Sequence, residues 1–163
     1  MKALAEKIGE RLKARGALLV TAESCTGGWA AQAVTAIAGS SEWFERGWVT
    51  YSNAAKQDEL GVRPETLARL GAVSEETARE MALGALEHSR GTIALAITGV
   101  AGPTGGSAAK PVGTVCFAWA AKGRPVSAQT RHFAGDREAV RRQSVEYALE
   151  RLLELLDEGS AQP

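Results

Sequence analysis

Two short apolar runs constrain the fold of this chain more than any other feature. They are ALLVTA, residues 17–22, and TIALAIT, residues 92–98, and neither alternates apolar with polar residues. Such a run is typical of a strand buried on both faces, which requires helices on either side of its sheet. We therefore expect a layered α/β fold with these two strands at its centre.

Helical and strand patterns alternate along the rest of the chain. Apolar spacing and capping residues predict helices at 2–15, about 28–38, 54–61 after an Asn53 cap, from Pro64, after a Ser74 cap, and from an Asp136 cap to about Leu156. Further strands are predicted at 47–53, 114–120 and 126–133, the last two as an antiparallel hairpin. The predicted fold is a three-layer α/β/α sandwich with a mixed sheet, in one domain over 1–163 with a frayed tail at 157–163.

Composition excludes several classes of function. The 19 basic residues equal the 19 acidic ones, whereas nucleic-acid binding usually shows as a basic excess. No apolar run is long enough to span a membrane, and the charged N-terminus is unlike a signal peptide, so a cytoplasmic protein is expected. Cys25 and Cys116 are expected to be free thiols, and His88 and His132 stand alone, so no metal site is expected.

Polar residues follow the first buried strand where the next helix begins. Ser24 offers a hydroxyl beside the amides of a helix N-terminus, which can hold an oxyanion. Gly27 and Gly28 each weaken a helix, a cost that makes sense if a ligand approaches the backbone closely. The alternative is that Ser24 or Thr26 is only an N-cap.

Lys56 lies within the first turn of the helix predicted after Asn53. The positive end of a helix lowers the pKa of a lysine, which a lysine general base requires. Tyr51 could bring a second proton-transfer hydroxyl to the same place. The alternative is that Lys56 is merely solvated.

A glycine-rich loop after the second buried strand matches no phosphate-binding motif, since neither GxxxxGK[ST] nor GxGxxG is present. Its amides could form an anion nest, or it could be a flexible surface loop. Arg137, Arg141 and Arg142 near the start of the last helix are candidates for binding an anion, although most such arginines are solvated.

Five segments in register resemble the CinA C-terminal domain family, from about residue 3 to residue 156. The segments are AESCTGG, GSSEWFERGWVTYSNAAK, GAVSEETAREMA, ITGVAGPTGGSAAKPVGTV and FAGDREAVRRQSVEYAL. The chain departs from the family's usual pattern at Trp29, Trp48 and Ser107, none of which removes a catalytic group.

The resemblance implies hydrolysis of the carboxamide of nicotinamide mononucleotide to nicotinic acid mononucleotide and ammonia, without metal or cofactor. It implies Ser24 as the nucleophile, Lys56 as the base with Tyr51 assisting, and Arg137 at the substrate's phosphate. The remaining substrate-binding residues that it implies are Thr26, Gly27, Gly28, Gly39, Thr98, Gly99, Gly105, Gly106 and Ser107. It also implies a homodimer.

Three alternatives stay open on the sequence. Cys25 is intrinsically the better nucleophile, although adjacent residues point in different directions and only one of the two can face Lys56. The chain could be a catalytically silent module that binds a nucleotide or a partner. A role in DNA uptake or damage response, suggested by the family's historical name, finds no basic excess in this sequence.

Overall fold

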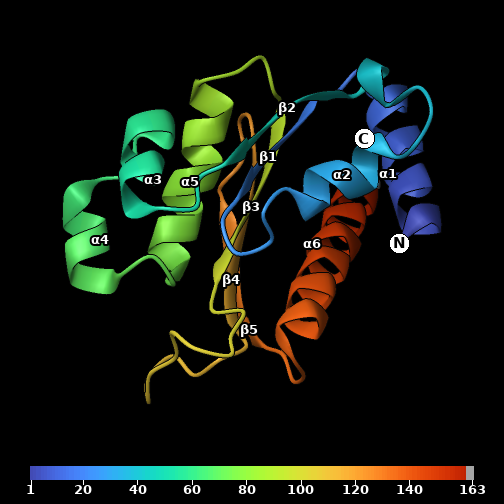
Figure 1. Ribbon diagram of the computed structural model, residues 1–163. Helices are drawn as coiled ribbons and strands as arrows, with labels where there is room; N and C mark the ends of the chain where they lie inside the picture. The colour runs from blue at the N-terminus through green and yellow to red at the C-terminus, as the bar shows by residue number, and fades with distance from the viewer. Residues whose placement is uncertain (161–163) are drawn as a thin grey trace.

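The computed structural model describes residues 1–160 and has a mixed sheet at its centre (Figure 1). The strand order is β2-β1-β3-β4-β5, with β2, β1 and β3 parallel to one another and β4 antiparallel to both β3 and β5. The strands are β1 Leu19–Glu23, β2 Phe44–Val49, β3 Ile93–Gly99, β4 Thr114–Ala121 and β5 Ser127–His132. The mixed sheet and the antiparallel hairpin predicted from sequence are therefore confirmed.

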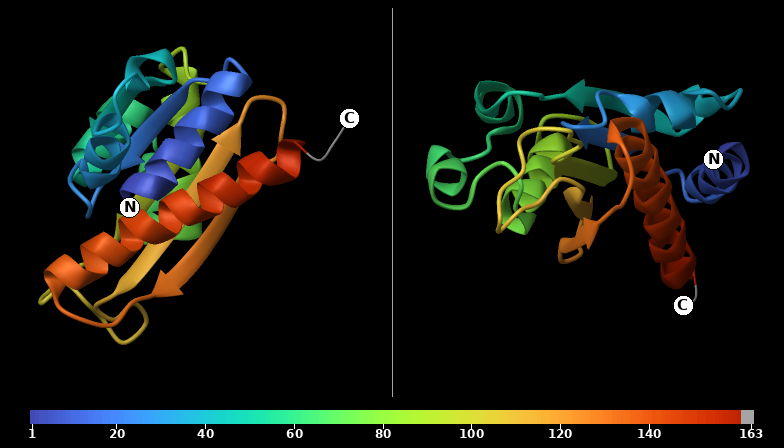
Figure 2. Two further views of the ribbon diagram at one scale, coloured as in Figure 1. Left: turned by 90° about the vertical axis from the view of Figure 1, so that its right-hand side faces the viewer. Right: turned by 60° about the horizontal axis from the view of Figure 1, so that its bottom comes forward.

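Helices cover both faces of this sheet, as the two buried strands require. Figure 1 shows α3 (Asn53–Leu60), α4 (Pro64–Leu70) and α5 (Glu75–Glu87) on one face. The other face carries α1 (Lys2–Ala14), α2 (Trp29–Thr35), and α6 (Arg137–Ser160), and α1 and α6 run side by side there (Figure 2, left). A short 3₁₀ helix, η1 (Ser40–Glu42), precedes β2. The three-layer α/β/α prediction is confirmed.

Side-chain size differs between the two faces of the central strands. Leu95, Ile97, Phe117 and Trp119 pack toward the α1–α6 layer, whereas the alternate positions Ala94, Ala96, Cys116 and Ala118 pack toward α5. Small residues let α5 lie close to the sheet. On its other side, α5 approaches α3 closely, because a Cβ added at Gly84 would lie 1.9 Å from the carbonyl oxygen of Leu60.

The second strand of the chain lies earlier than the sequence indicated, at 44–49 instead of 47–53. The chain leaves the sheet after Val49, because the Thr50 amide makes a last bond to the Glu23 carbonyl and α3 begins soon after. Ser52, not Asn53, caps α3, since the Ser52 Oγ accepts from the Ala55 amide at 3.0 Å. The capping predictions at Ser74 and Asp136 are confirmed.

Two helix ends also differ from the prediction. Helix α2 stops at Thr35, whose hydroxyl donates back to the Ala31 carbonyl at 2.7 Å, a bond that weakens helices. Helix α6 continues to Ser160, beyond the end predicted at about Leu156, and residues 161–163 of the predicted frayed tail lie outside the described residues. Ion pairs of Asp157 with Arg11 and of Glu158 with Arg151 tie this last stretch to α1 and to the preceding turns.

Candidate active site

The ends of β1 and β3 and the segment after β2 meet in one pocket of about 350 Å³. Figure 1 shows β3 running toward the yellow glycine-rich loop, near the start of α6, and residues of these segments line the pocket. Parallel strands bring their carboxyl ends to the same edge of a sheet, which is why segments far apart in sequence meet there. The pocket is lined by Ser24, Cys25, Tyr51, Lys56, Ala72, Val73, Thr98, Gly99, Val100, Ala101, Gly102, Thr104, Gly105 and Arg137.

Ser24 and Lys56 are in direct contact in this pocket. The Lys56 Nζ lies 3.0 Å from the Ser24 Oγ, and it also donates to the backbone carbonyls of Thr50 at 2.8 Å and Tyr51 at 3.3 Å. The Ser24 amide donates to the Ile97 carbonyl, so the β1–β3 ladder fixes the backbone of the serine. The structure thus brings together the two residues that the sequence singled out.

Burial determines the chemistry of the Lys56 amine. Only 1% of Lys56 is exposed, compared with 8% of Ser24. Loss of hydration lowers the pKa of Lys56 below its ordinary value, with a smaller opposing effect from Cys25. The sequence predicted a lowered pKa of Lys56 from burial beside Ser24 together with the positive end of the helix. Lys56 is the fourth residue of α3, and burial is the main cause.

Cys25 is unsuited to be the nucleophile at neutral pH. Its side chain is buried, and burial raises the pKa of the thiol to about 12. A thiol needs to ionise to attack, so at pH 7 almost none of the reactive form exists. Lys56 contacts Ser24 at hydrogen-bond distance, which favours the serine.

The turn between Ser24 and α2 needs both of its glycines. Gly27 has φ +60° and Gly28 has φ +100°, both in the left-handed region that favours glycine. Thr26 is fully buried, and its hydroxyl donates to the Glu23 carboxylate at 2.6 Å instead of facing the pocket. The Gly27 amide is taken by the Ser24 carbonyl, so this amide is not available to a substrate oxyanion in this conformation.

Tyr51 contributes to the pocket differently from the sequence expectation. Its backbone carbonyl faces the Ser24–Lys56 pair, while the residue as a whole is 60% exposed. The Tyr51 hydroxyl accepts a hydrogen bond from the Arg137 guanidinium at 3.1 Å, and Arg137 also donates to the Gly102 carbonyl at 2.8 Å. Arg137 therefore bridges the rim of the pocket, and the Tyr51 hydroxyl is occupied there.

The glycine-rich loop enters the pocket only in part. Gly99 and Gly105 line it as predicted, and Thr98 lines it while donating its hydroxyl to the Ala72 carbonyl at 2.9 Å. Gly106 and Ser107 are not among the lining residues, and Ser107 instead closes a turn with Lys110. Gly39 lies in a different hollow beside α1, away from the Ser24 pocket, so the structure does not bring it to the site.

Arg141 was a candidate for binding an anion, but it contacts the backbone of the turn after Ser24 instead. Its guanidinium donates to the carbonyls of Cys25 at 3.0 Å and Thr26 at 3.2 Å, and it lies over the Trp29 ring. Helix α6 thus holds the turn after Ser24 from outside.

The family model of the CinA C-terminal domain matches residues 1–156. This chain belongs to the CinA C-terminal domain family. The match covers nearly the whole described chain, from α1 to the last part of α6, and includes every lining residue of the Ser24 pocket. The resemblance inferred from the five sequence segments is confirmed.

Curated relatives in this family carry the name nicotinamide-nucleotide amidohydrolase PncC. The Escherichia coli K12 protein of that name is 59% identical over 150 residues, covering 91% of this chain and 90% of that protein. The Pseudomonas putida protein is 53% identical, covering 93% and 94%. Among solved structures, the competence/damage inducible protein CihA from Agrobacterium tumefaciens is 49% identical with a TM-score of 0.92, covering 94% of both chains.

Sequence reasoning missed two residues that line this CinA-family pocket and one that is buried beside it. Ala72 and Val73, from the connection between α4 and α5, line the pocket. Small apolar residues carry no sequence signal for a binding site, so they could not be predicted. The buried residue is Glu23, which directly precedes Ser24 and is fully buried but does not line the pocket. A charged residue at the end of an apolar strand was a visible signal, because buried charges require partners.

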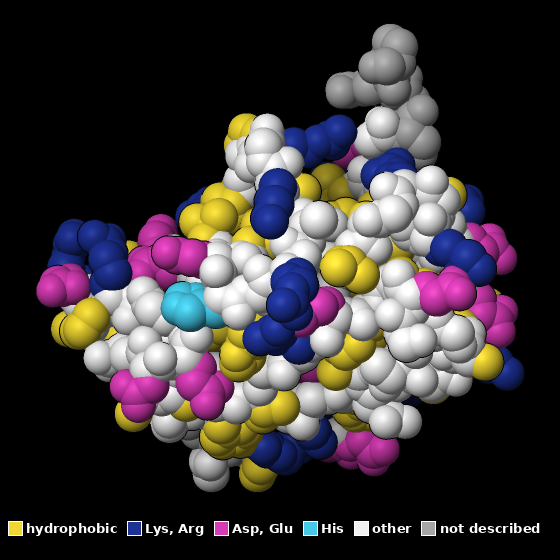
Figure 3. Space-filling view, turned by 90° about the horizontal axis from the view of Figure 1, so that it is seen from above, with side chains coloured by type: hydrophobic (Ala, Val, Ile, Leu, Met, Phe, Trp, Pro, Cys, Tyr) yellow, Lys and Arg dark blue, Asp and Glu magenta, His cyan; other side chains and the backbone are white. Residues whose placement is uncertain are grey.

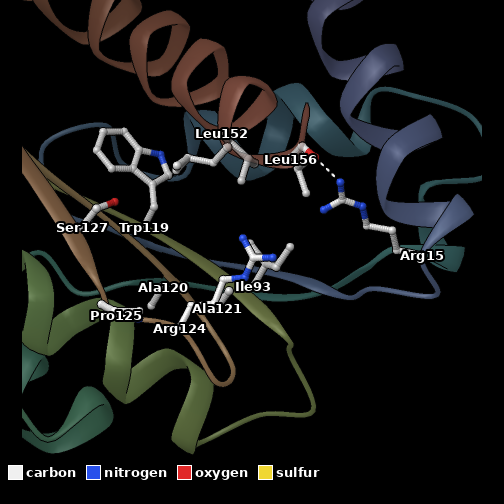
Figure 4. Close-up of a pocket in the computed structure, with 11 residues that line it drawn as sticks. Arg15, Ile93, Trp119, Ala120, Ala121, Arg124, Pro125, Ser127, Leu152 and Leu156 are labelled. Carbon is white, nitrogen blue, oxygen red and sulfur yellow. Dashed lines mark hydrogen bonds between the residues drawn. The ribbon is translucent and has the colours of Figure 1, made fainter. Parts of the chain in front are cut away.

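A second cavity, of about 160 Å³, lies at the opposite end of the sheet (Figure 4). It is lined by Ile93 at the start of β3, whereas β3 ends at Gly99 in the Ser24 pocket. Apolar residues dominate its wall, and Arg15 at its edge donates to the Leu156 carbonyl. Among the described residues that line it, Ser127 is the only one with a hydroxyl and none is a lysine, so this lining lacks the serine–lysine pair of the Ser24 pocket.

Residues 1–160 contain neither a membrane-spanning helix nor a cluster of metal-binding side chains. No helix in that range is both long and apolar enough to cross a membrane. No group of three or more His, Cys, Asp or Glu side chains in the same range could hold a metal ion. Both cysteines are free thiols in the described structure.

Proposed function

We propose that this chain is an amidohydrolase that converts nicotinamide mononucleotide to nicotinic acid mononucleotide and ammonia, with Ser24 as nucleophile and Lys56 as general base. The observation that carries the proposal is the 3.0 Å contact between a serine hydroxyl and a buried lysine whose pKa is lowered. The substrate is taken from the names of relatives that are 53–59% identical over most of the chain.

The hydrogen bonds of Lys56 suit a neutral amine. A neutral amine has two N–H groups and one lone pair, and the Thr50 and Tyr51 carbonyls can accept the two N–H bonds. The lone pair then faces the Ser24 Oγ and accepts its proton. The two carbonyls thereby accept both N–H groups of the neutral amine and orient its lone pair toward Ser24.

The reaction proceeds in two halves. As the Ser24 Oγ forms a bond to the carboxamide carbon, Lys56 takes the hydroxyl proton and a tetrahedral intermediate forms. When the C–N bond breaks, Lys56 returns this proton to the nitrogen and ammonia leaves. Water then attacks the resulting ester, gives a proton to Lys56, and the C–Oγ bond breaks with return of that proton to Ser24.

Arg137 is the proposed contact for the substrate's phosphate. It lines the pocket, and its guanidinium already spans from the Gly102 carbonyl to the Tyr51 hydroxyl. A phosphate is a stronger, charged acceptor than either of these neutral groups, so it can replace one of them. Tyr51 then acts at the rim of the pocket, and its backbone carbonyl serves the dyad.

The proposal also places the enzyme in the cytoplasm as a homodimer. The two free, buried cysteines are in keeping with a reducing compartment. The outer edge of β2 pairs with no other strand of the described chain and is available to a second copy. Sedimentation analysis of the purified protein distinguishes a dimer from a monomer.

Ammonia release from nicotinamide mononucleotide tests the proposed function. We expect the purified protein to release ammonia and nicotinic acid mononucleotide in equal amounts, and to act more slowly on nicotinamide riboside, which lacks the phosphate. Binding of the mononucleotide without ammonia release would instead identify a silent binding module.

A further inference from the structure

Glu23 is a fully buried carboxylate that the proposed mechanism does not use. Its Oε1 accepts from the Thr26 hydroxyl at 2.6 Å and from the Ala30 amide at 2.8 Å. Its Oε2 accepts from the Ala31 amide at 3.1 Å. A buried carboxylate without partners would be very costly, so these donors are what keeps Glu23 inside the protein.

These contacts connect the two ends of the turn that carries Ser24. Glu23 is the last residue of β1, and Ala30 and Ala31 are in the first turn of α2. Gly28, the residue at the N-cap of α2, has no side chain to satisfy those amides. The Glu23 carboxylate reaches across the turn and takes that role.

The backbone of Glu23 is fixed as firmly as its side chain. Its carbonyl accepts from the Thr50 amide at 2.9 Å, and the Thr50 carbonyl in turn accepts from the Lys56 Nζ. The strand end that carries Ser24 and the segment that positions Lys56 therefore meet at Glu23. A shift of either changes the 3.0 Å contact between Ser24 and Lys56.

We propose that Glu23 is a positioning residue for the nucleophile: its carboxylate fixes the turn 24–28 so that the Ser24 hydroxyl points at Lys56. The inference rests on the proposed function only in taking Ser24 as the nucleophile. Glu23 touches neither Ser24 nor Lys56 through its carboxylate, and burial accounts for the lowered pKa of Lys56. Its effect is therefore geometric.

The chain contains a matched control for Glu23. Glu80 also accepts from a backbone amide, that of Arg63 at 2.9 Å, and from a threonine hydroxyl, that of Thr66 at 2.6 Å. These bonds hold the start of α4, and neither Glu80 nor its partners line the Ser24 pocket. Loss of the Glu80 carboxylate removes a similar set of bonds without touching the turn 24–28.

The test compares Glu23→Ala, Glu23→Gln and Glu80→Ala with the wild type. We expect Glu23→Ala to lower kcat for ammonia release by about 10-fold to 100-fold, because even a small misplacement of reacting groups slows the chemical step. KM should change by less than about threefold. The pH midpoint of the rate should not move. Glu23→Gln should keep more activity than Glu23→Ala, because its amide oxygen can still accept from Thr26 and Ala30. Glu80→Ala should keep the wild-type kcat.

A second readout does not depend on the natural substrate. Phenylmethylsulfonyl fluoride reacts with an activated serine: the Oγ–S bond forms, the S–F bond breaks, fluoride leaves, and the base takes the proton. Mass spectrometry then measures how fast Ser24 is modified. If the wild type fails to release ammonia from the mononucleotide, the proposed substrate is wrong, while the labelling rates still test Glu23.

The labelling rate should follow the order wild type and Glu80→Ala, then Glu23→Gln, then Glu23→Ala. A folded Glu23→Ala that labels as fast as the wild type would overturn the proposal. An equal loss in Glu80→Ala would also overturn it, because the effect would then be general destabilisation. Should Glu23→Ala not fold, Glu23→Gln and Thr26→Val decide the question, and wild-type rates in both would contradict a positioning role.

Discussion

At the scale of single residues, the protonation state of Lys56 controls the proposed chemistry. A lysine with its ordinary pKa of about 10.5 would be almost wholly protonated at neutral pH and unable to take the Ser24 proton. Burial disfavours the ammonium and lowers the pKa of Lys56. Because the neutral form is the active one, the rate must rise with pH through this lowered pKa.

The pH dependence of the rate, combined with one substitution, tests this role. We expect kcat/KM to be low below the pKa of Lys56 and to rise to a plateau at a pH well under 10.5. Lys56→Arg retains a positive charge but cannot deprotonate, so it should lose about 100-fold or more of kcat at every pH while the protein still binds nucleotide. Substantial turnover by Lys56→Arg would show that Lys56 acts as an electrostatic contact and that the base lies elsewhere.

At the scale of elements, the start of α6 and the glycine-rich loop meet the other elements around the pocket. Arg137 at the first position of α6 donates to Gly102 of the loop and to Tyr51 after β2, so one side chain joins three segments. One turn later, Arg141 holds the backbone of Cys25 and Thr26. The two arginines thus have separate tasks, the first at the rim and the second behind the turn.

Arg137→Ala should therefore affect the phosphate-bearing substrate selectively. A charge-assisted contact with phosphate supports a fall in kcat/KM for the mononucleotide of about 10-fold or more, with a smaller fall for the riboside. Arg142→Ala is the matched control, because Arg142 lies on the same helix but does not line the pocket. Equal losses on both substrates would exclude Arg137 from the phosphate site.

Most helices and strands could be predicted from the sequence alone, whereas the bounds of β2 could not. Order, type and layer of the main elements followed from apolar patterns and caps, because each buried strand and amphipathic helix has a local signature. Strand β2 was placed three residues late because 47–53 looks like a strand, whereas the Thr50 amide and carbonyl serve Glu23 and Lys56. That requirement is tertiary and has no local signature.

In the site, too, some residues could be predicted from the sequence, whereas the placement of others depends on tertiary contacts. Ser24, Lys56 and Arg137 were candidates because each lies near a helix start, the family resemblance implied their roles, and the structure places all three at one pocket. Gly39 and Ser107 were carried by family resemblance, and the structure places both outside that pocket. The direction of the Tyr51 side chain depends on Arg137, which lies far along the chain and could not be paired with it from sequence.

At the scale of the whole molecule, close packing between helices supports the position of the base. Lys56 is carried by α3, and α3 packs on α5 through the contact of Leu60 with Gly84. On the face seen in Figure 3, basic and acidic side chains are interspersed and form no continuous basic stripe. This face therefore lacks the continuous basic surface that is typical of nucleic-acid binding.

Gly84→Ala should therefore reduce stability and activity together. The added Cβ would lie 1.9 Å from the Leu60 carbonyl oxygen, so α3 and α5 must separate. Overpacking of this kind costs about 1–3 kcal/mol, which lowers Tm by several degrees in a domain of this size. Leu83→Ala, on the exposed side of the same helix, should change stability by less than about 0.5 kcal/mol. Thermal unfolding of the two variants gives the comparison, and an unchanged Tm for Gly84→Ala would contradict the described packing.

The most direct test of the Ser24–Lys56 mechanism is ammonia release from nicotinamide mononucleotide by Ser24→Ala and Cys25→Ala, each confirmed to be folded. Loss of the Ser24 hydroxyl, which lies 3.0 Å from the Lys56 Nζ, should abolish turnover in Ser24→Ala. Cys25→Ala should keep most of the wild-type rate, because burial raises the pKa of that thiol to about 12 and leaves it protonated. Wild-type turnover by Ser24→Ala, or an inactive but folded Cys25→Ala, would contradict the assignment of Ser24 as the nucleophile.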